Sequence, residues 1–289
     1  MMLYSASSLA LLCLLAAGLN DLVFKFYVTK QRSRGMLVCG IGLVWAVLQL
    51  TYIFSQQITL DFNQATLIYG IAAAVIVTLS NILLLECLGH LPISMASTVY
   101  RLNTIPLVLL AFVFLGEQIN LYQSLGIVAG LCAVLLFYQR YQSSANQQSN
   151  YRQFVIIIII ASCLRALYGI LTKAGINHNA DTDAMILMSA IGWLLGGLLY
   201  AGLREKRIVV TSDKLKFALI SGFLVFSIVW LLTKALLLGD ASIVVPLANM
   251  SFIAAFIFSV GFRLEVLTRK KMLAVSCAAI SVVLLALNA

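Results

Sequence analysis

The chain has 289 residues, of which 62% are hydrophobic and only 10% are charged, and its mean hydropathy is +1.04. Soluble domains carry about 25% charged residues, so this composition excludes an ordinary soluble enzyme, and the net charge of +9 does not indicate nucleic-acid binding. A helix needs about 20 apolar residues to cross a hydrocarbon layer of about 30 Å. We therefore expect a polytopic α-helical membrane protein.

Apolar runs of about that length recur along the whole chain. The first group of five lies at 3–27, 36–55, 65–88, 92–115 and 121–138. After a polar segment at 139–153, a second group of five lies at 154–174, 184–202, 215–238, 241–262 and 272–287. The sequence predicts an all-α membrane protein with ten transmembrane helices, divided into a first five-helix repeat (1–138), a polar cytoplasmic linker (139–153) and a second five-helix repeat (154–289).

An odd number of spans in each half requires the second half to be inverted relative to the first. Internal similarity supports such a repeat. Gly89, at the entry to the fourth run, matches Gly239 at the entry to the ninth, and Lys25, near the end of the first run, matches Lys173 near the end of the sixth. We therefore interpret the two halves as inverted repeats.

Basic residues are confined to alternate connections. Fourteen of them follow the first, seventh and ninth runs or flank the central linker: Lys30, Arg32, Arg34, Arg140, Arg152, Arg204, Lys206, Arg207, Lys214, Lys216, Arg263, Arg269, Lys270 and Lys271. The connections after the second, fourth, sixth and eighth runs contain neither Lys nor Arg. The positive-inside rule then places the fourteen residues in the cytoplasm and both termini outside. No charged n-region precedes the first run, so we expect no cleaved signal peptide.

Arg101 is the most informative intramembrane residue, because an ionisable group at mid-membrane costs about 3 kcal/mol on insertion scales. It lies near the middle of the fourth run, where Ser94, Ser97, Thr98 and Thr104 share one helical face with it. That face should line a helix contact or a wet cavity. A guanidinium group in a cavity presents a planar fork to a carboxylate or phosphate, so we predict that Arg101, Ser97 and Thr98 contact substrate.

Arg165, near mid-depth in the sixth run and one turn before Tyr168, is the second predicted substrate contact. The alternative is that the two arginines pair with Glu86 and Asp21 and fix helix packing. Asp21 has a further alternative partner in Lys25, four residues later on the same helix. If Glu86 or Asp21 lacked a cationic partner, it would suit proton coupling, so both are candidate coupling residues.

Further candidates come from aromatic, amide and proline side chains within the runs. Tyr100, Tyr168 and Trp230 either form an aromatic wall of the cavity or fill space between helices, and Asn249 offers a polar contact in the ninth run. Pro106 and Pro246 lie in the fourth and ninth runs, where a missing backbone donor permits a kink, so we predict them as gating elements. Gly192 and Gly196 form a small-xxx-small pair that favours packing within the chain over a dimer seam.

The end of the first half reads ECLGHLPISMASTVYRLNTIPLVLLAFVFLGEQINLYQSLGIVAGLCAVLLF, in which a break at Gly89 precedes a Ser/Ala-rich run that ends in LGE. The second copy, LLLGDASIVVPLANMSFIAAFIFSVGFRLEV, has RLE in place of LGE. Over nearly its whole length the chain resembles the drug/metabolite transporter superfamily in its ten-span, EamA-type form. The resemblance implies a central cavity between the repeats and alternating access, by exchange or proton coupling. Members usually place both termini in the cytoplasm, opposite to the orientation that the charges predict.

We therefore expect a transporter of a bacterial cytoplasmic membrane that moves an amino acid or another carboxylate- or phosphate-bearing solute. The alternatives are a flippase for lipids or lipid-linked carriers with the same fold, a non-transporting receptor or structural bundle, and an intramembrane enzyme. The six cysteines and two histidines have no metal-site spacing, and the chain has no P-loop. We expect no metal and no cofactor beyond a coupled proton or counter-substrate, no nucleic-acid partner, and a monomer with a dimer as the alternative.

Overall fold

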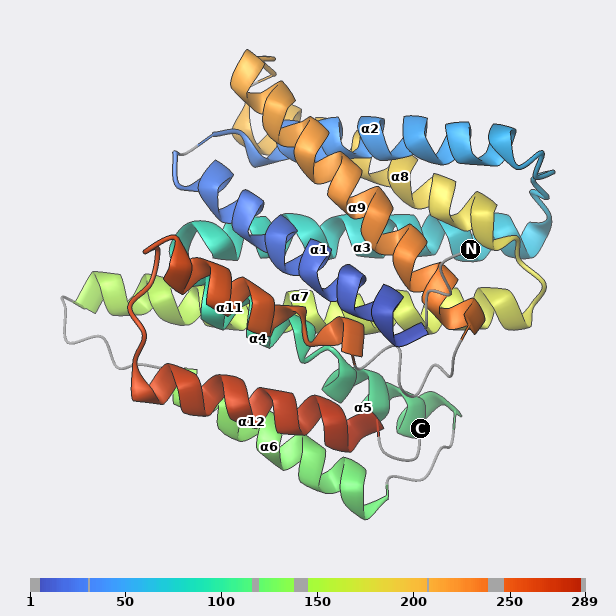
Figure 1. The fold of residues 1–289 in the computed structure, drawn as a ribbon. Coiled ribbons are helices and arrows are strands. Elements are labelled where there is room, and N and C mark those ends of the chain that lie inside the picture. The colour runs from blue at the N-terminus through green and yellow to red at the C-terminus, as the bar shows by residue number, and fades with distance from the viewer. Residues whose placement is uncertain are drawn as a thin grey trace.

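The computed structural model describes residues 6–30, 32–115, 120–137, 145–206, 208–238 and 247–286, which form helices and short connections with no strand among them (Figure 1). The helices are α1 (Ala6–Val28), α2 (Arg34–Ser55), α3 (Gln64–His90), α4 (Ile93–Arg101), α5 (Thr104–Leu115), α6 (Leu121–Phe137), α7 (Ala145–Asn177), α8 (Thr182–Tyr200), the π-helical turn η1 (Ala201–Glu205), α9 (Ser212–Leu238), α11 (Ser251–Gly261) and α12 (Arg269–Ala286).

Six of these helical segments are long and apolar enough to cross a membrane. They are α1, α2, α3, the part of α7 from Tyr151 to Asn177, the continuous segment Thr182–Glu205, and the part of α9 from Ser212 to Ala235. Two shorter apolar helices occupy Leu121–Leu136 and Leu247–Gly261. The all-helical membrane class is therefore confirmed, whereas the count of ten crossings stays a prediction.

The fourth apolar run is not one continuous helix, as its length suggested. It divides into α4 and α5 at a turn formed by Leu102 and Asn103. Pro106 has no N–H to donate to the carbonyl of Leu102, and that carbonyl instead accepts a hydrogen bond from the Ile105 N–H at 3.0 Å. The ninth run is interrupted similarly, by a turn at Met250 between helical residues 247–249 and α11.

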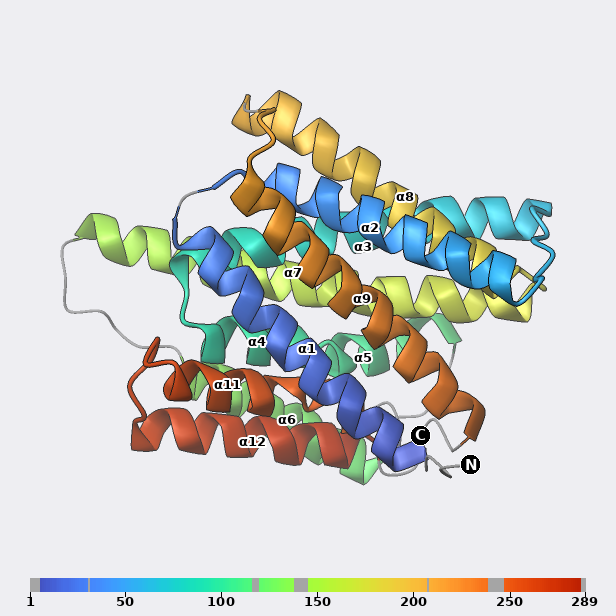
Figure 2. The same ribbon diagram turned by 45° about the horizontal axis from the view of Figure 1, so that its top comes forward.

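The helices pack in a pattern that repeats between the two halves (Figures 1 and 2). α1 lies against α9 as α3 lies against α7, and α2 lies against α9 as α8 lies against α3. α2 pairs with α8, and α6 pairs with α12. The corresponding helices of the two halves are α1 and α7, α2 and α8, α3 and α9, and α6 and α12. When each helix is replaced by its counterpart, the first two pairs of contacts interchange, and the contacts α2–α8 and α6–α12 are unchanged. This symmetry fits two inverted repeats.

Glycines allow α8 to approach its neighbours closely. A Cβ atom on Gly197 would lie 2.3 Å from the backbone nitrogen of Cys39 in α2. On the other side, a Cβ on Gly192 would lie 2.8 Å from the Cβ of Ala74, and one on Gly196 would lie 2.6 Å from Cγ2 of Thr78. Gly192 and Gly196 therefore pack within the chain, as the sequence favoured.

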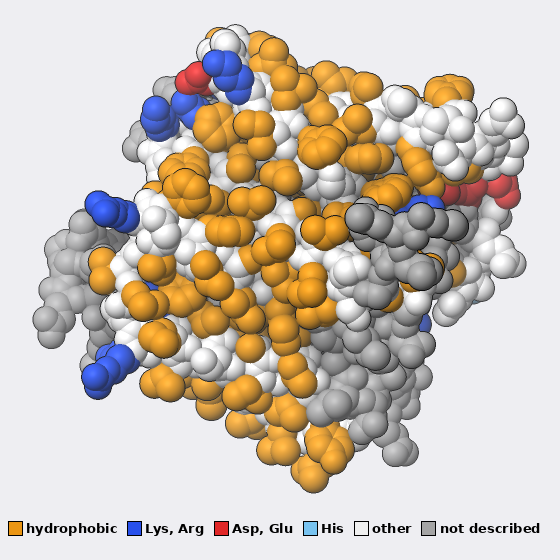
Figure 3. All heavy atoms as spheres, viewed as in Figure 1, with side chains coloured by type: hydrophobic (Ala, Val, Ile, Leu, Met, Phe, Trp, Pro, Cys, Tyr) orange, Lys and Arg blue, Asp and Glu red, His pale blue; other side chains and the backbone are white. Residues whose placement is uncertain are grey.

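The two ends of the bundle differ in their charged residues. Apolar side chains cover most of the face in Figure 3, and Lys and Arg side chains gather at its left edge. We call this the basic end. The helices α1, α3, η1 and α11 end there, and the helices α2, α4, α9 and α12 begin there. The described chain begins at Ala6 and stops at Ala286 near the other end, here called the opposite end. Which end faces the cytoplasm stays a prediction.

Candidate functional site

A buried ion pair links α1 to α4 within the first half. The carboxylate of Asp21, in α1, is only 2% exposed and accepts a hydrogen bond from the Ser97 hydroxyl at 2.5 Å. Arg101 Nη2, at the end of α4, lies 3.8 Å from the other Asp21 oxygen, and its side chain is 13% exposed. The structure thus realises the Asp21–Arg101 pair, one of the two roles that the sequence left open for Arg101.

Several buried polar atoms around this pair have no hydrogen-bond partner among the described residues: Asn20 Oδ1, Thr98 Oγ1, Arg101 Nε, Thr104 Oγ1 and Ser251 Oγ. They lie next to Asp21 in α1, on both sides of the α4–α5 turn, and at the start of α11, which packs against α1 and α4. A buried polar atom without a partner costs about 1–3 kcal/mol. The region is therefore suited to a polar solute or to ordered water.

Arg165 lies in the same region, on α7. Its guanidinium carbon is 5.0 Å from the ring centroid of Tyr168, a cation–π contact. No carboxylate of the described residues forms an ion pair with it. The Cys13 thiol, in α1, is within electrostatic reach of both Arg101 and Arg165. Both predicted arginines therefore lie within electrostatic reach of α1, and only Arg101 is paired with a carboxylate of the described residues.

The three aromatic residues that were predicted to form a wall of the cavity lie in different environments. Tyr100 is buried in the main core, and its hydroxyl lies 3.2 Å from that of Ser80, so it fills space between helices. Tyr168 is half-buried. Trp230 is 38% exposed, with Lys234 Nζ 5.9 Å from its ring centroid. Tyr168 and Trp230 remain available as wall residues, whereas the burial of Tyr100 argues against that role.

The other predicted site residues are placed as follows. Ser97 and Thr98 are fully buried, and Asn249 is half-buried just before the turn at Met250. Pro106 lies just beyond the α4–α5 turn, and Pro246 lies outside the described residues. A hinge at the α4–α5 turn therefore has a structural basis in Pro106.

Glu86 does not pair with either central arginine. Arg34, at the start of α2, lies 2.5 Å from its carboxylate, and the Tyr200 hydroxyl donates a hydrogen bond to it at 2.5 Å. Glu86 thus joins α2, α3 and α8 at the basic end. The sequence missed these partners because Arg34 was counted only among the loop charges.

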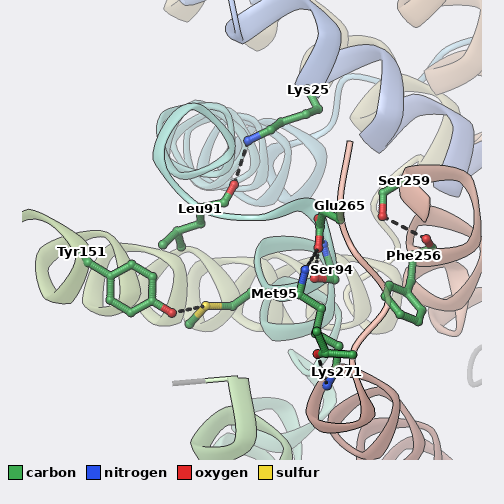
Figure 4. A network of polar contacts seen from close by, with 10 residues as sticks. Lys25, Leu91, Ser94, Met95, Tyr151, Phe256, Ser259, Glu265 and Lys271 are labelled. Atoms are coloured by element: carbon green, nitrogen blue, oxygen red, sulfur yellow. Dashed lines mark hydrogen bonds and ion pairs between the residues drawn. The ribbon is translucent and has the colours of Figure 1, made fainter. Parts of the chain in front are cut away.

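The predicted local pair of Asp21 with Lys25 is also replaced by other contacts. Lys25 Nζ donates to the carbonyl oxygens of Leu88 at 2.6 Å and Leu91 at 2.8 Å, where α3 ends (Figure 4). The last carbonyls of a helix have no partner within it and carry its negative dipole end, so a lysine there is favourable. Lys25 therefore ties α1 to the α3–α4 connection.

Glu265 is a polar contact between the halves that the sequence did not identify (Figure 4). Its carboxylate, 5% exposed, accepts hydrogen bonds from the Ser94 backbone N–H at 2.9 Å and the Ser94 hydroxyl at 2.5 Å, and it lies 2.7 Å from Lys271 Nζ. Ser94 begins α4, where free N–H groups favour an anion. Glu265, from the second half, thus fixes α4 of the first. The sequence feature that pointed to it was the tripeptide RLE, whose glutamate is Glu265 and which stands where the first half has LGE.

Two comparisons with known proteins find similarity. The sequence profile of the EamA-like transporter family matches residues 5–139 and again residues 153–287. A solved structure described only as "Crystal structure of protein" superposes with a TM-score of 0.67 over 95% of each chain at 14% sequence identity, which shows a shared fold. No curated protein matches the sequence.

Proposed function

The chain belongs to the EamA-like transporter family, and from this premise we propose that it moves a small organic anion or zwitterion by alternating access between its two halves. Membership makes it a multi-pass membrane transporter of the drug/metabolite type. The proposal adds the substrate class, which is a solute bearing a carboxylate or phosphate such as an amino acid, and the mechanism. It rests on one observation: among the described residues, Arg101 and Arg165 have one carboxylate partner between them, Asp21, which pairs with Arg101, while Arg165 lies over the Tyr168 ring.

Charge balance supports an anionic group on the substrate. An arginine held away from water is expensive unless a negative group accompanies it. Arg165 is half-buried and lies over the Tyr168 ring, and no carboxylate of the described residues pairs with it, so a substrate carboxylate or phosphate would supply that group through two parallel hydrogen bonds. The unpaired hydroxyls of Thr98 and Thr104 then offer contacts to the rest of the solute.

Arg101 provides a second, competitive contact. At 3.8 Å its Nη2 is within ion-pair range of Asp21 but beyond good hydrogen-bond distance, while Ser97 already donates to the carboxylate. Arg101 can therefore turn toward a substrate anion and leave Asp21 with Ser97. Asp21 would then favour taking up a proton, which is the route by which transport could couple to protons.

The interrupted helices supply the moving parts. Short or broken spans in corresponding positions of two inverted halves are typical of transporter binding sites. Here the breaks lie at Leu102–Asn103 and at Met250, and α11 packs against both α1 and α4. Bending at the first break would move Arg101 relative to α1 without unfolding either half-helix.

The test is transport by proteoliposomes that contain only this protein. A panel of labelled amino acids, organic acids, phosphorylated sugars and neutral sugars is first screened for thermal stabilisation, and the hits are then measured for uptake and exchange. We expect flux of an anionic or zwitterionic solute and none of neutral sugars. Flux only of neutral solutes would refute the substrate class, and headgroup-dependent lipid scrambling without solute flux would favour the flippase instead.

A further inference from the structure

An apolar cavity of about 620 Å³ lies along the seam between α3 and α8, apart from the Arg101–Asp21 pair. This volume is within the range of small-molecule sites. Its walls include Val75 and Leu79 from α3 and Ile191 and Leu195 from α8, all of them exposed. The cavity therefore opens on the outside of the bundle, toward the surface that faces lipid in a membrane.

Local sequence explains why a groove forms at this seam. Gly192 and Gly196 let the backbone of α8 approach Ala74 and Thr78 closely. The branched side chains that flank these small residues stand to either side as walls. The groove runs from Met188 to Arg204, which is about 24 Å at 1.5 Å per residue and is enough to accept an acyl chain from one leaflet of a layer about 30 Å thick.

The groove has a positive charge at one end only. Arg204, in η1 at the basic end, is exposed and is the only charged residue in the lining. No carboxylate of the described residues pairs with it. The adjacent Glu205 does not neutralise it, because that carboxylate accepts hydrogen bonds from the Ser33 hydroxyl and from the Arg34 backbone N–H. Arg204 thus offers a free guanidinium group where the apolar groove meets the headgroup layer.

We propose that this seam binds an anionic phospholipid, with one acyl chain in the groove and the phosphate on Arg204. The lining gives a polar solute almost nothing to hydrogen-bond, whereas an acyl chain needs no such partner. A guanidinium group matches a phosphate in shape and charge, and basic residues at a membrane surface favour anionic lipids. The site is independent of the transported solute, so it stands or falls separately from the proposed function.

The first experiment is native mass spectrometry of the purified protein in detergent, titrated with phosphatidylglycerol or with phosphatidylcholine of the same acyl chains. We expect one phosphatidylglycerol to be retained preferentially. Arg204→Gln should lower its retention about fivefold, to the phosphatidylcholine level. The matched control is Arg269→Gln, which removes a charge from the same end on α12 and should change nothing. Equal retention of phosphatidylglycerol by wild type and Arg204→Gln would overturn the proposal.

A second variant tests the groove itself. Leu195→Trp fills the groove from an exposed position and should displace both lipids, whereas Leu43→Trp, at an exposed position of α2 outside the lining, should displace neither. If Leu195→Trp binds phosphatidylglycerol like wild type, the acyl chain lies elsewhere and the proposal fails. It also fails if the spectra show a dimer that Leu195→Trp dissociates, because the seam would then be a contact between two copies.

Discussion

The two ends of the bundle are packed differently, although inverted repeats would make them equivalent. At the basic end, the last turns of α1 and α3 are buried on almost every side, as at Phe24, Tyr27 and Leu88. Toward the opposite end, α7 and α9 are only half-buried through residues 167–172 and 226–229, whereas the matching residues of the first half, 19–24 and 78–81, are mostly buried. Among the described residues, the matching stretches of the two halves are therefore packed more tightly toward the basic end than toward the opposite end. A transporter that alternates access would have this asymmetry when one gate is closed.

One pair of repeat-related residues illustrates the difference. Lys25 in α1 caps the carbonyls at the end of α3, whereas its counterpart Lys173 in α7 is exposed. Glu265 adds a second tie at the basic end, from the α11–α12 connection to the start of α4. If the two halves alternate access as proposed, closure at either end would depend on a lysine that caps the end of the facing helix. Conversion to the other state would release Lys25 and engage Lys173.

The largest effect is expected at the centre, which both states must share. Arg101→Ala should lower transport at least about 100-fold, because the variant loses a substrate contact and leaves Asp21 buried without its partner. It should also destabilise the protein by about 3–5 kcal/mol, the typical cost of an uncompensated buried charge. Flux in proteoliposomes and thermal unfolding in detergent measure the two effects.

A double variant separates these two roles. Asp21→Asn together with Arg101→Gln removes both charges and should recover most of the stability while transport stays lost. If the double variant transports like wild type, the ion pair serves packing alone, and neither residue belongs to the substrate site.

The second-largest effect is expected in a labelling experiment that tests the difference in packing between the two ends. Cysteines introduced at Leu84 in α3 and at Leu232, the corresponding position of α9, are labelled with a water-soluble maleimide in a background without native cysteines. We expect Leu84→Cys to be protected and Leu232→Cys to react. Lys25→Met should raise the labelling rate at position 84 about tenfold by opening the basic end, because the α3 carbonyls lose their cap.

Lys173→Met is the matched control, because Lys173 is exposed and makes no such contact with the residues that the structure describes. It should leave labelling at position 84 unchanged. Equal labelling at positions 84 and 232 in the wild-type protein would mean that the two ends are equally closed and would remove the basis for the comparison.

The fold class was predictable because each helix carries its own apolar run. The breaks were only partly predictable: Pro106 indicated a kink in the fourth run, but a sequence does not specify whether a proline bends a helix or divides it. The Asp21–Arg101 pair was foreseen as one alternative, since both residues are ionisable and lie within apolar runs.

The partners of Glu86, Lys25 and Glu265 could not be predicted from local spacing. Lys25 was expected to meet Asp21 because they are four residues apart, but the free carbonyls at the end of α3 compete for its ammonium group. Glu86 finds Arg34 only because the start of α2 lies beside the end of α3. Such contacts depend on tertiary arrangement, which an apolar periodicity leaves open.

A smaller effect is expected from the second tie at the basic end. Glu265→Gln keeps a side chain that can accept from Ser94 but removes the charge that Lys271 and the start of α4 require. We expect a loss of about 1.5–3 kcal/mol in thermal unfolding, the range for hydrogen bonds to charged groups. Labelling of Leu84→Cys should rise less than with Lys25→Met. No change in either measurement would remove Glu265 from the closure of this end.

The smallest effect is expected at the surface of the same end, where Arg32 Nη2 lies 2.6 Å from Asp213 and the Asp213 side chain is 60% exposed. Asp213→Asn should change stability by less than about 0.5 kcal/mol, because water already screens the pair and Arg32 keeps its contact with the Phe217 ring. Thermal unfolding at low and high salt measures this change. If Asp213→Asn destabilises the protein as much as Glu265→Gln, and high salt abolishes both effects, then the charges at the surface together hold the helices of the basic end in contact. A salt-insensitive loss with Glu265→Gln alone would attribute closure to the buried contact at the start of α4.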